Sequence, residues 1–183
     1  MTRGVRHSVR KLLLLGAVGL TAVAVVPSTA APSARARSVA LSPLEAGVLR
    51  ELNAIRTAHG FVPLRVNARL TDAAAQHSRE MTAQGYFAHE SADGSSFWRR
   101  VERYYAPDGA AFWSVGENLL WSAPDVDAKR ALELWMASPH HRENILNPRW
   151  REIGIAAVHA HAAPGTFHGL DVTVVTTDFG VRR

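Results

Sequence analysis

The sequence predicts an α+β fold, with helices in the first part of the domain and strands at its end. Apolar residues recur at helical spacing from Leu44 onward, whereas β-branched residues dominate the run from Val172 to Phe179. A second strand-like run covers 153–158, and Pro164-Gly165 between the two runs favours a hairpin. Grouped helices followed by paired strands are typical of α+β folds rather than of βαβ repeats.

Four to five helices are expected around a small antiparallel sheet. The first begins sharply, because Ser42-Pro43-Leu44-Glu45 is a capping box with Pro at the first helical position, and it ends near Gly60. Ser138 is expected to cap the last helix with its side chain, and Pro139 takes that helix's first position. The helices between them are expected over about 68–83, over about 97–105, and from a cap at Asp125 to Ala137.

Residues 1–30 have the pattern of a secretory signal peptide. Basic residues precede an apolar run from Leu12 to Val26, and Ser28-Thr29-Ala30 offers a small-residue cleavage site. The apolar run is shorter than the ~20 residues of a spanning helix, so we expect cleavage and no membrane span afterwards. An uncleaved N-terminal anchor is the alternative. Residues 31–41 are predicted to be a disordered linker, and 42–183 a single domain.

Charge and cysteine content exclude several classes of protein. The formal net charge is +5, but four basic residues lie in the signal-like segment, and from Leu41 onward 15 Lys and Arg face 16 Asp and Glu. A domain so close to neutral gives no electrostatic reason to expect nucleic-acid binding. The absence of cysteine excludes disulfides and a lipid-bearing signal-site cysteine.

Three short motifs place polar groups inside otherwise apolar segments: Phe87–Ser91, Gly116–Leu119 and Trp135–Leu146. Burying imidazoles or carboxylates costs free energy unless they meet each other, a metal or a ligand. A shared polar cavity is therefore expected. Its candidate groups are His89, Glu117 and His141.

Two imidazoles and one carboxylate allow two chemical interpretations. They are a familiar ligand set for a divalent metal such as Zn or Mg with open coordination positions. They could equally form a metal-free network in which Glu117 accepts a hydrogen bond from one imidazole. Purely structural roles for each residue also remain open. His141 is expected to be neutral, because the first turn of a helix disfavours imidazolium.

The other histidines have less specific interpretations. His77 lies on an apolar helical stripe and is expected to be a packing residue with one satisfied hydrogen bond, or else to line the floor of the cavity. His140 is expected to face solvent, with a supplementary ligand role as the alternative. The alternation of His159 and His161 favours one exposed face and no site.

The motifs in this order and spacing resemble those of the CAP superfamily, also called the SCP domain, and specifically a bacterial secreted member. The match includes Phe-x-His-x-x-x-x-Gly, Gly-Glu-Asn, and Trp-x-x-Ser-x-x-His-Arg-x-Asn-Ile-Leu, and also Thr177–Gly180 as a last strand. The resemblance implies a three-layer α-β-α sandwich and a cavity lined by two histidines and two acidic residues. His89, Glu117 and His141 match three of them, and Ser138 stands in place of the second acid.

The resemblance implies a secreted protein that binds a small apolar or amphipathic ligand, or a divalent metal, at the cell envelope or outside the cell. The expected binding residues are His89, Glu117, His141, Ser138 and Asn118, and the expected partner is a small molecule, lipid or envelope component. The alternative is a protease-like hydrolase with His89, Glu117 and His141 as catalytic candidates. We favour a binding module, because no nucleophile elbow is present. A third possibility is that the cluster only stabilises the fold.

Overall fold

The structure, a computed structural model, describes residues 39–183. In this part, the expected helices are present and a four-stranded sheet lies between two helical layers. The elements are α1 (Pro43–Ala58), β1 (Arg65–Val66), α2 (Ala68–Gln84), α3 (Phe97–Tyr104), β2 (Trp113–Ser122), α4 (Ala128–Ala137), α5 (Pro139–Ile145), β3 (Glu152–Ala163), a 3₁₀ turn (Gly165–Phe167) and β4 (Leu170–Arg182). The α+β class predicted from the sequence is confirmed.

The sheet has the order β1-β3-β4-β2. The hairpin of β3 and β4 is antiparallel as expected, and β2 pairs antiparallel with β4. However, β1 pairs parallel with β3, so the sheet is mixed rather than purely antiparallel. Strand β2 lies at one edge of the sheet, and the sequence pattern does not predict it.

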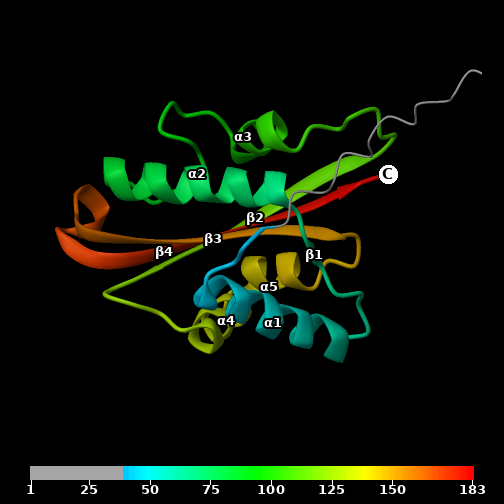
Figure 1. Cartoon of the computed structure of the whole chain (residues 1–183), viewed down its shortest axis with the longest axis horizontal. Coiled ribbons are helices and arrows are strands. Elements are labelled where there is room, and N and C mark those ends of the chain that lie inside the picture. Colours follow the sequence, from blue (N-terminus) through cyan, green and yellow to red (C-terminus); the bar gives the residue numbers. More distant parts are fainter. Residues whose placement is uncertain (1–38) are drawn as a thin grey trace, which may run out of the picture. The chain divides into compact units, whose positions relative to one another are not determined.

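Helices cover both faces of the sheet (Figure 1). α2 and α3 lie on one face, and α1, α4 and α5 lie on the other. Successive side chains of β4 alternate between the two faces of the sheet. Val175 belongs to the core beneath α1 and α4, whereas Val174 belongs to the core on the α2 side. The expected three-layer arrangement is therefore confirmed, and side chains of either layer can reach the β2 edge.

Gly154 allows α2 to lie directly against β3. A Cβ atom at this position would come within 2.0 Å of the backbone carbon of Leu70. Only glycine permits so close an approach, because any other residue would force the helix away from the sheet. This contact sets the distance between α2 and the strands that carry the site.

The helix ends agree in part with the sequence. The capping box at Ser42 is present. The cap of α4 is Asp127 and not Asp125, whose carboxylate instead lies 3.4 Å from the Thr173 hydroxyl. Ser138 occupies the N-cap position of α5, but its side chain makes no capping hydrogen bond, so that expected role is corrected.

The signal peptide and most of the linker predicted from the sequence lie outside the described residues. Val39 to Leu41, at the end of the predicted linker, form neither helix nor strand. Within 39–183, no helix combines the length and the apolar character needed to cross a membrane.

Candidate functional site

Glu117 is the centre of the site. It comes from the edge strand β2, and its side chain is 0% exposed. His89 donates from Nδ1 to Glu117 Oε1 at 2.8 Å, and Arg100 donates from Nη2 to Glu117 Oε2. Both oxygens of the carboxylate are thus bonded to cationic or proton-donating groups, which offsets the cost of burying its charge.

Arg100, on α3, connects the segment that carries His89 to this carboxylate. Its guanidinium is buried and also donates from Nη1 to the His89 carbonyl oxygen at 3.2 Å and to Ser91 Oγ at 3.0 Å. One buried side chain therefore fixes both the backbone around His89 and the carboxylate that its ring contacts. Sequence reasoning gave no role to this arginine, since nothing in its local pattern separates it from exposed arginines nearby.

His89 presents the rest of its ring to solvent. Its side chain is 48% exposed, although Nδ1 is engaged with Glu117. The hydrogen bond that His89 donates to Glu117 raises the pKa of His89 above its ordinary value, against the opposing effect of partial burial. The hydrogen bond expected from one imidazole to Glu117 is therefore present. A half-exposed imidazole with a fixed orientation leaves Nε2 available to bind a ligand.

His141 approaches the Glu117 end of the site from α5, which lies on the face of the sheet opposite to α3. Asn118 donates from Nδ2 to the His141 carbonyl oxygen at 3.1 Å, and Asn144 donates from Nδ2 to the Glu117 carbonyl oxygen at 3.0 Å. Asn144 also donates to Asn118 Oδ1 at 2.9 Å. The asparagines of two predicted motifs thus attach α5 to β2 beside Glu117.

Burial lowers the pKa of His141, and the positive charges of His89 and His140 lower it further. The influence of His89 indicates that the two rings lie close enough to interact electrostatically. The neutral state expected for His141 agrees with this direction of shift. The leading cause is burial, however, and not the helix dipole invoked from the sequence.

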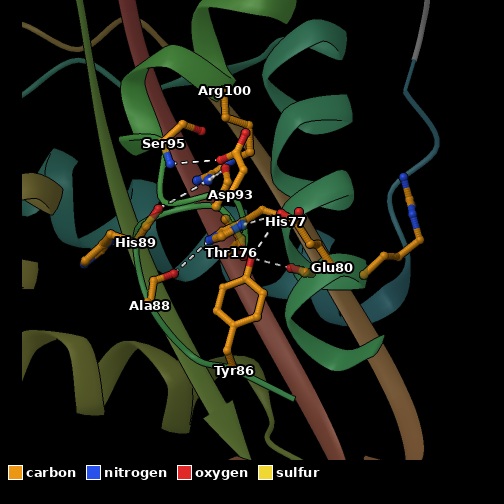
Figure 2. A network of polar contacts seen from close by, with 12 residues as sticks. His77, Glu80, Tyr86, Ala88, His89, Asp93, Ser95, Arg100 and Thr176 are labelled. Atoms are coloured by element: carbon orange, nitrogen blue, oxygen red, sulfur yellow. Dashed lines mark hydrogen bonds and ion pairs between the residues drawn. The ribbon is translucent and has the colours of Figure 1, made fainter. Parts of the chain in front are cut away.

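His77 lies in the buried layer beneath this site. Its Nε2 is 2.9 Å from the Ala88 carbonyl oxygen, and its Nδ1 is 3.7 Å from Glu80 Oε2 (Figure 2). Tyr86 donates its hydroxyl to the same Glu80 oxygen at 2.9 Å. Burial lowers the pKa of His77, so the ring is neutral and donates from Nε2 to the carbonyl. This geometry supports the expectation of a packing residue with one satisfied hydrogen bond.

Asp178 is a buried carboxyl group that the sequence analysis did not identify as a site residue. It stands opposite Glu117 in the β2–β4 pairing, and neither of its oxygens has a hydrogen-bond partner among residues 39–183. Burial, followed by the charge of Glu117, raises the pKa of Asp178 well above its ordinary value. The one available signal was an acidic residue within a run of β-branched strand residues.

The structure therefore brings together some of the expected site residues more closely than others. His89 and Glu117 are directly bonded, His141 lies at the same strand edge, and the amide of Asn118 serves to attach α5. Ser138 is half-buried at the start of α5. Within 39–183, the group of three potential ligands whose atoms all lie within 4.8 Å of one another is a different one: His159, His161 and Asp171.

Comparisons with known proteins agree with this fold. The chain is 30% identical over 131 residues to YkwD, an uncharacterized protein of Bacillus subtilis, covering 72% of this chain and 46% of that protein. It is 26% identical to a Bacillus anthracis extracellular protein that contains an SCP domain, with a TM-score of 0.55, covering 80% of this chain and 45% of that one. An outer surface protein of Borrelia burgdorferi shares the fold at 18% identity, with a TM-score of 0.56, covering 74% of this chain and 90% of that one.

The chain thus spans less than half the length of the two Bacillus proteins. Residues 49–175 match the model of the CAP family, described as the cysteine-rich secretory protein family. That range contains all three polar motifs and every element from β1 to β3. This chain belongs to the CAP family.

Proposed function

We propose that this protein acts outside the cell as a binding module, and that His89 and His141 together bind a divalent transition-metal ion. The observation that carries the proposal is the hydrogen bond from His89 Nδ1 to the buried Glu117 carboxylate. Metal-binding histidines usually donate their other ring N–H to a carboxylate or carbonyl, which fixes the tautomer and the ring orientation. A neutral His141 nearby offers the second nitrogen.

The donor set favours zinc over magnesium. Imidazole nitrogens suit zinc, whereas magnesium prefers oxygen ligands. Both Glu117 oxygens are engaged by His89 and Arg100, so this carboxylate orients His89 rather than binding the metal itself. Two histidines leave the remaining coordination positions to water or to a small ligand. The lipid or envelope ligand expected from the family remains a prediction.

The extracellular location rests on two observations of different kinds. The sequence begins with the pattern of a signal peptide, and a similar SCP-domain protein of Bacillus anthracis is described as extracellular. Cell fractionation with an antibody against the domain would test this location. Recovery of the protein mainly from the cytoplasm would overturn it.

A zinc titration followed by the ring signals of the histidines in NMR spectra tests the metal site. The background variant His161→Gln removes one member of the group at His159 and Asp171, so that binding there does not confuse the result. We expect the signals of His89 and His141 to shift together, and His141→Gln to weaken zinc binding at least tenfold. His140→Gln is the matched control, because His140 is adjacent on α5 and its side chain is 96% exposed. Equal zinc affinity in both variants would overturn the proposal.

A hydrolase is the second candidate, and the His89–Glu117 pair favours it. An imidazole oriented by a carboxylate is suited to act as a general base toward water. No serine of the described residues is bonded to either His89 or His141, so water would be the nucleophile. Turnover of generic ester or peptide substrates that is abolished by His89→Gln, in a folded variant, would replace the binding-module proposal with this one.

A further inference from the structure

The end of the β3–β4 hairpin brings together two histidines and an aspartate. His159 and His161 lie two residues apart on β3, so their side chains point to the same face of the strand. His161 Nδ1 lies 3.1 Å from Asp171 Oδ2 on β4, and the two imidazole rings are nearly perpendicular with centroids 4.8 Å apart. One potential ligand atom from each of the three residues lies within 4.8 Å of the others.

The backbone fixes the orientation of Asp171. Its Oδ1 accepts a hydrogen bond from the Ala162 amide at 3.0 Å, which leaves Oδ2 for His161. Ala162 has a φ of 47° and lies at an irregularity in the pairing between Ala160 and Ala163. Such bulges re-aim side chains relative to a regular ladder. The carboxylate is thus held in place before any ion binds, which reduces the cost of ordering a site.

A second carboxylate faces the cluster from a third element. Asp125 precedes α4, and its Oδ1 lies 3.7 Å from His159 Nδ1. Within 39–183, the only groups that form ion pairs with Asp125 and Asp171 are the two histidines. Two carboxylates facing two imidazoles, without a lysine or arginine between them, make a suitable environment for a cation.

The cluster is separate from the site at Glu117. His159 stands opposite Thr173, five residues along β4 from Asp178, which stands opposite Glu117. At about 3.3 Å per residue, this separation is roughly 16 Å along the strand. The strand alternation also places Thr173 with Val175 on the α1 face, whereas Thr176 contacts Ser78 of α2 on the other face.

We propose that His159, His161 and Asp171 form a second binding site for a divalent transition-metal ion, with Asp125 as a further oxygen donor. Two imidazole nitrogens and a carboxylate oxygen are a common zinc ligand set. Around a tetrahedral zinc ion with bonds of about 2.0 Å, ligand atoms lie about 3.3 Å apart. The 3.1 Å between His161 Nδ1 and Asp171 Oδ2 matches this spacing. The His159 side chain is exposed, so its rotation would bring a ring nitrogen to the same distance from the other two ligand atoms. An ion there would tie the hairpin to the loop before α4.

Zinc titration of the whole chain by calorimetry, with ring signals of the histidines recorded by NMR, tests this site. The background variant His141→Gln removes a ligand of the site proposed at His89. We expect zinc to shift the signals of His159 and His161, and magnesium at the same concentration to leave them unchanged. His161→Gln and Asp171→Asn should each lower the zinc affinity at least tenfold. Both residues are exposed, so the variants should fold normally.

His168→Asn provides the matched control. His168 is an exposed histidine of the same hairpin, and asparagine tolerates its φ of 55° better than most residues do. We expect this variant to bind zinc as the parent does. The proposal is overturned if zinc leaves the His159 and His161 signals in place, or if His161→Gln and His168→Asn reduce affinity equally. If only His89→Gln lowers the zinc affinity in this background, the zinc is bound at the other site and the proposal is overturned.

Discussion

Asp178 and Glu117 are direct cross-strand neighbours on β4 and β2, and both carboxyl groups are buried. Glu117 has Arg100 and His89 as partners, whereas neither oxygen of Asp178 has a hydrogen-bond partner in the described part of the chain. Two adjacent negative charges in a buried environment repel each other strongly. Burial and the neighbouring charge of Glu117 raise the pKa of Asp178 well above its ordinary value, which favours the protonated form of its carboxyl group. A protonated Asp178 beside an ionised Glu117 would give the pair a single negative charge.

Asp178→Asn should therefore be at least as stable as the wild type at pH 7. Because the folded-state pKa of Asp178 is raised, its contribution to stability is fully present below the unfolded value of 3.8 and is lost as pH rises toward the folded value. One proton corresponds to a slope of about 1.4 kcal/mol per pH unit. Urea unfolding between pH 4 and pH 8 should show that the asparagine variant lacks this decline.

Asp178→Ala separates charge from shape in the same experiment. The alanine variant also removes the charge, but it leaves a cavity and should be less stable than the asparagine variant at every pH. If Asp178→Asn is markedly destabilised at pH 7, the carboxyl group is ionised in the folded state and the single-charge description is wrong.

Glu117→Gln should destabilise the domain strongly. It leaves the buried Arg100 guanidinium without its charged partner, and breaking a buried pair in this way costs roughly 3–5 kcal/mol. The double variant with Arg100→Met should lose less than the sum of the single variants in urea unfolding. Glu133→Gln is the control, since its pair with Arg130 is exposed and worth less than about 1 kcal/mol. Equal losses for Glu117→Gln and Glu133→Gln would show that Glu117 does not organise the site.

The sequence predicted the helices and the hairpin because their signals are local. The capping box at Ser42 and the β-branched run before Phe179 each specify their element within a few residues. His89, Glu117 and His141 were found through motif resemblance, and the direct bond between the first two agrees with that choice. Local patterns thus sufficed to predict these elements, although the caps expected from Asp125 and from the Ser138 side chain were wrong.

Strand β2 could not be predicted because its two central polar residues, Glu117 and Asn118, are both buried. Their partners lie on α3 and α5, so the pattern of polar and apolar residues reports tertiary contacts rather than strand alternation. Asp171 could not be predicted as a site residue for the same reason, because its contact with His161 depends on the register of the hairpin. A pair of histidines two residues apart near a hairpin turn was the available signal.

The pKa values of His89 and His141, the two histidines of the proposed site, should be shifted in opposite directions from the ordinary value. The pKa of His89 is raised, chiefly by its bond to Glu117, and the pKa of His141 is lowered, chiefly by burial. An NMR titration should place His89 above and His141 below the ordinary value of 6.5. His89→Gln should raise the pKa of His141, because it removes a nearby positive charge.

These directions also determine how each histidine affects stability. The contribution of His89 is complete below pH 6.5 and is lost as pH rises through its folded pKa, whereas that of His141 is present above 6.5 and lost as pH falls through its folded pKa. Zinc binding at His89 should strengthen as pH rises, because a proton competes for Nε2. Identical pKa values for the two histidines would contradict the geometry described above.

Asn144→Ala should release α5 from β2 and change the environment of His141. Asn144 donates to the Glu117 carbonyl oxygen and to Asn118 Oδ1, and both acceptors would be left unsatisfied in a buried region. We expect a loss of about 1–3 kcal/mol in urea unfolding. The pKa of His141 should return toward its ordinary value, since burial is the main cause of its shift.

Gly116→Ala should also release α5 from β2, because Gly116 lies on the β2 side of the contact with Asn144. A Cβ atom at Gly116 would lie 3.0 Å from Asn144 Oδ1 and 2.9 Å from the Trp150 ring, so α5 would have to move away. Glu143→Ala is the control, because its side chain is 85% exposed on the same helix. If both Asn144→Ala and Gly116→Ala leave the pKa of His141 unchanged, the asparagine contacts do not position this histidine. In that case His141 would owe its place to α4 and α5 alone, and zinc affinity should be equally insensitive to both variants.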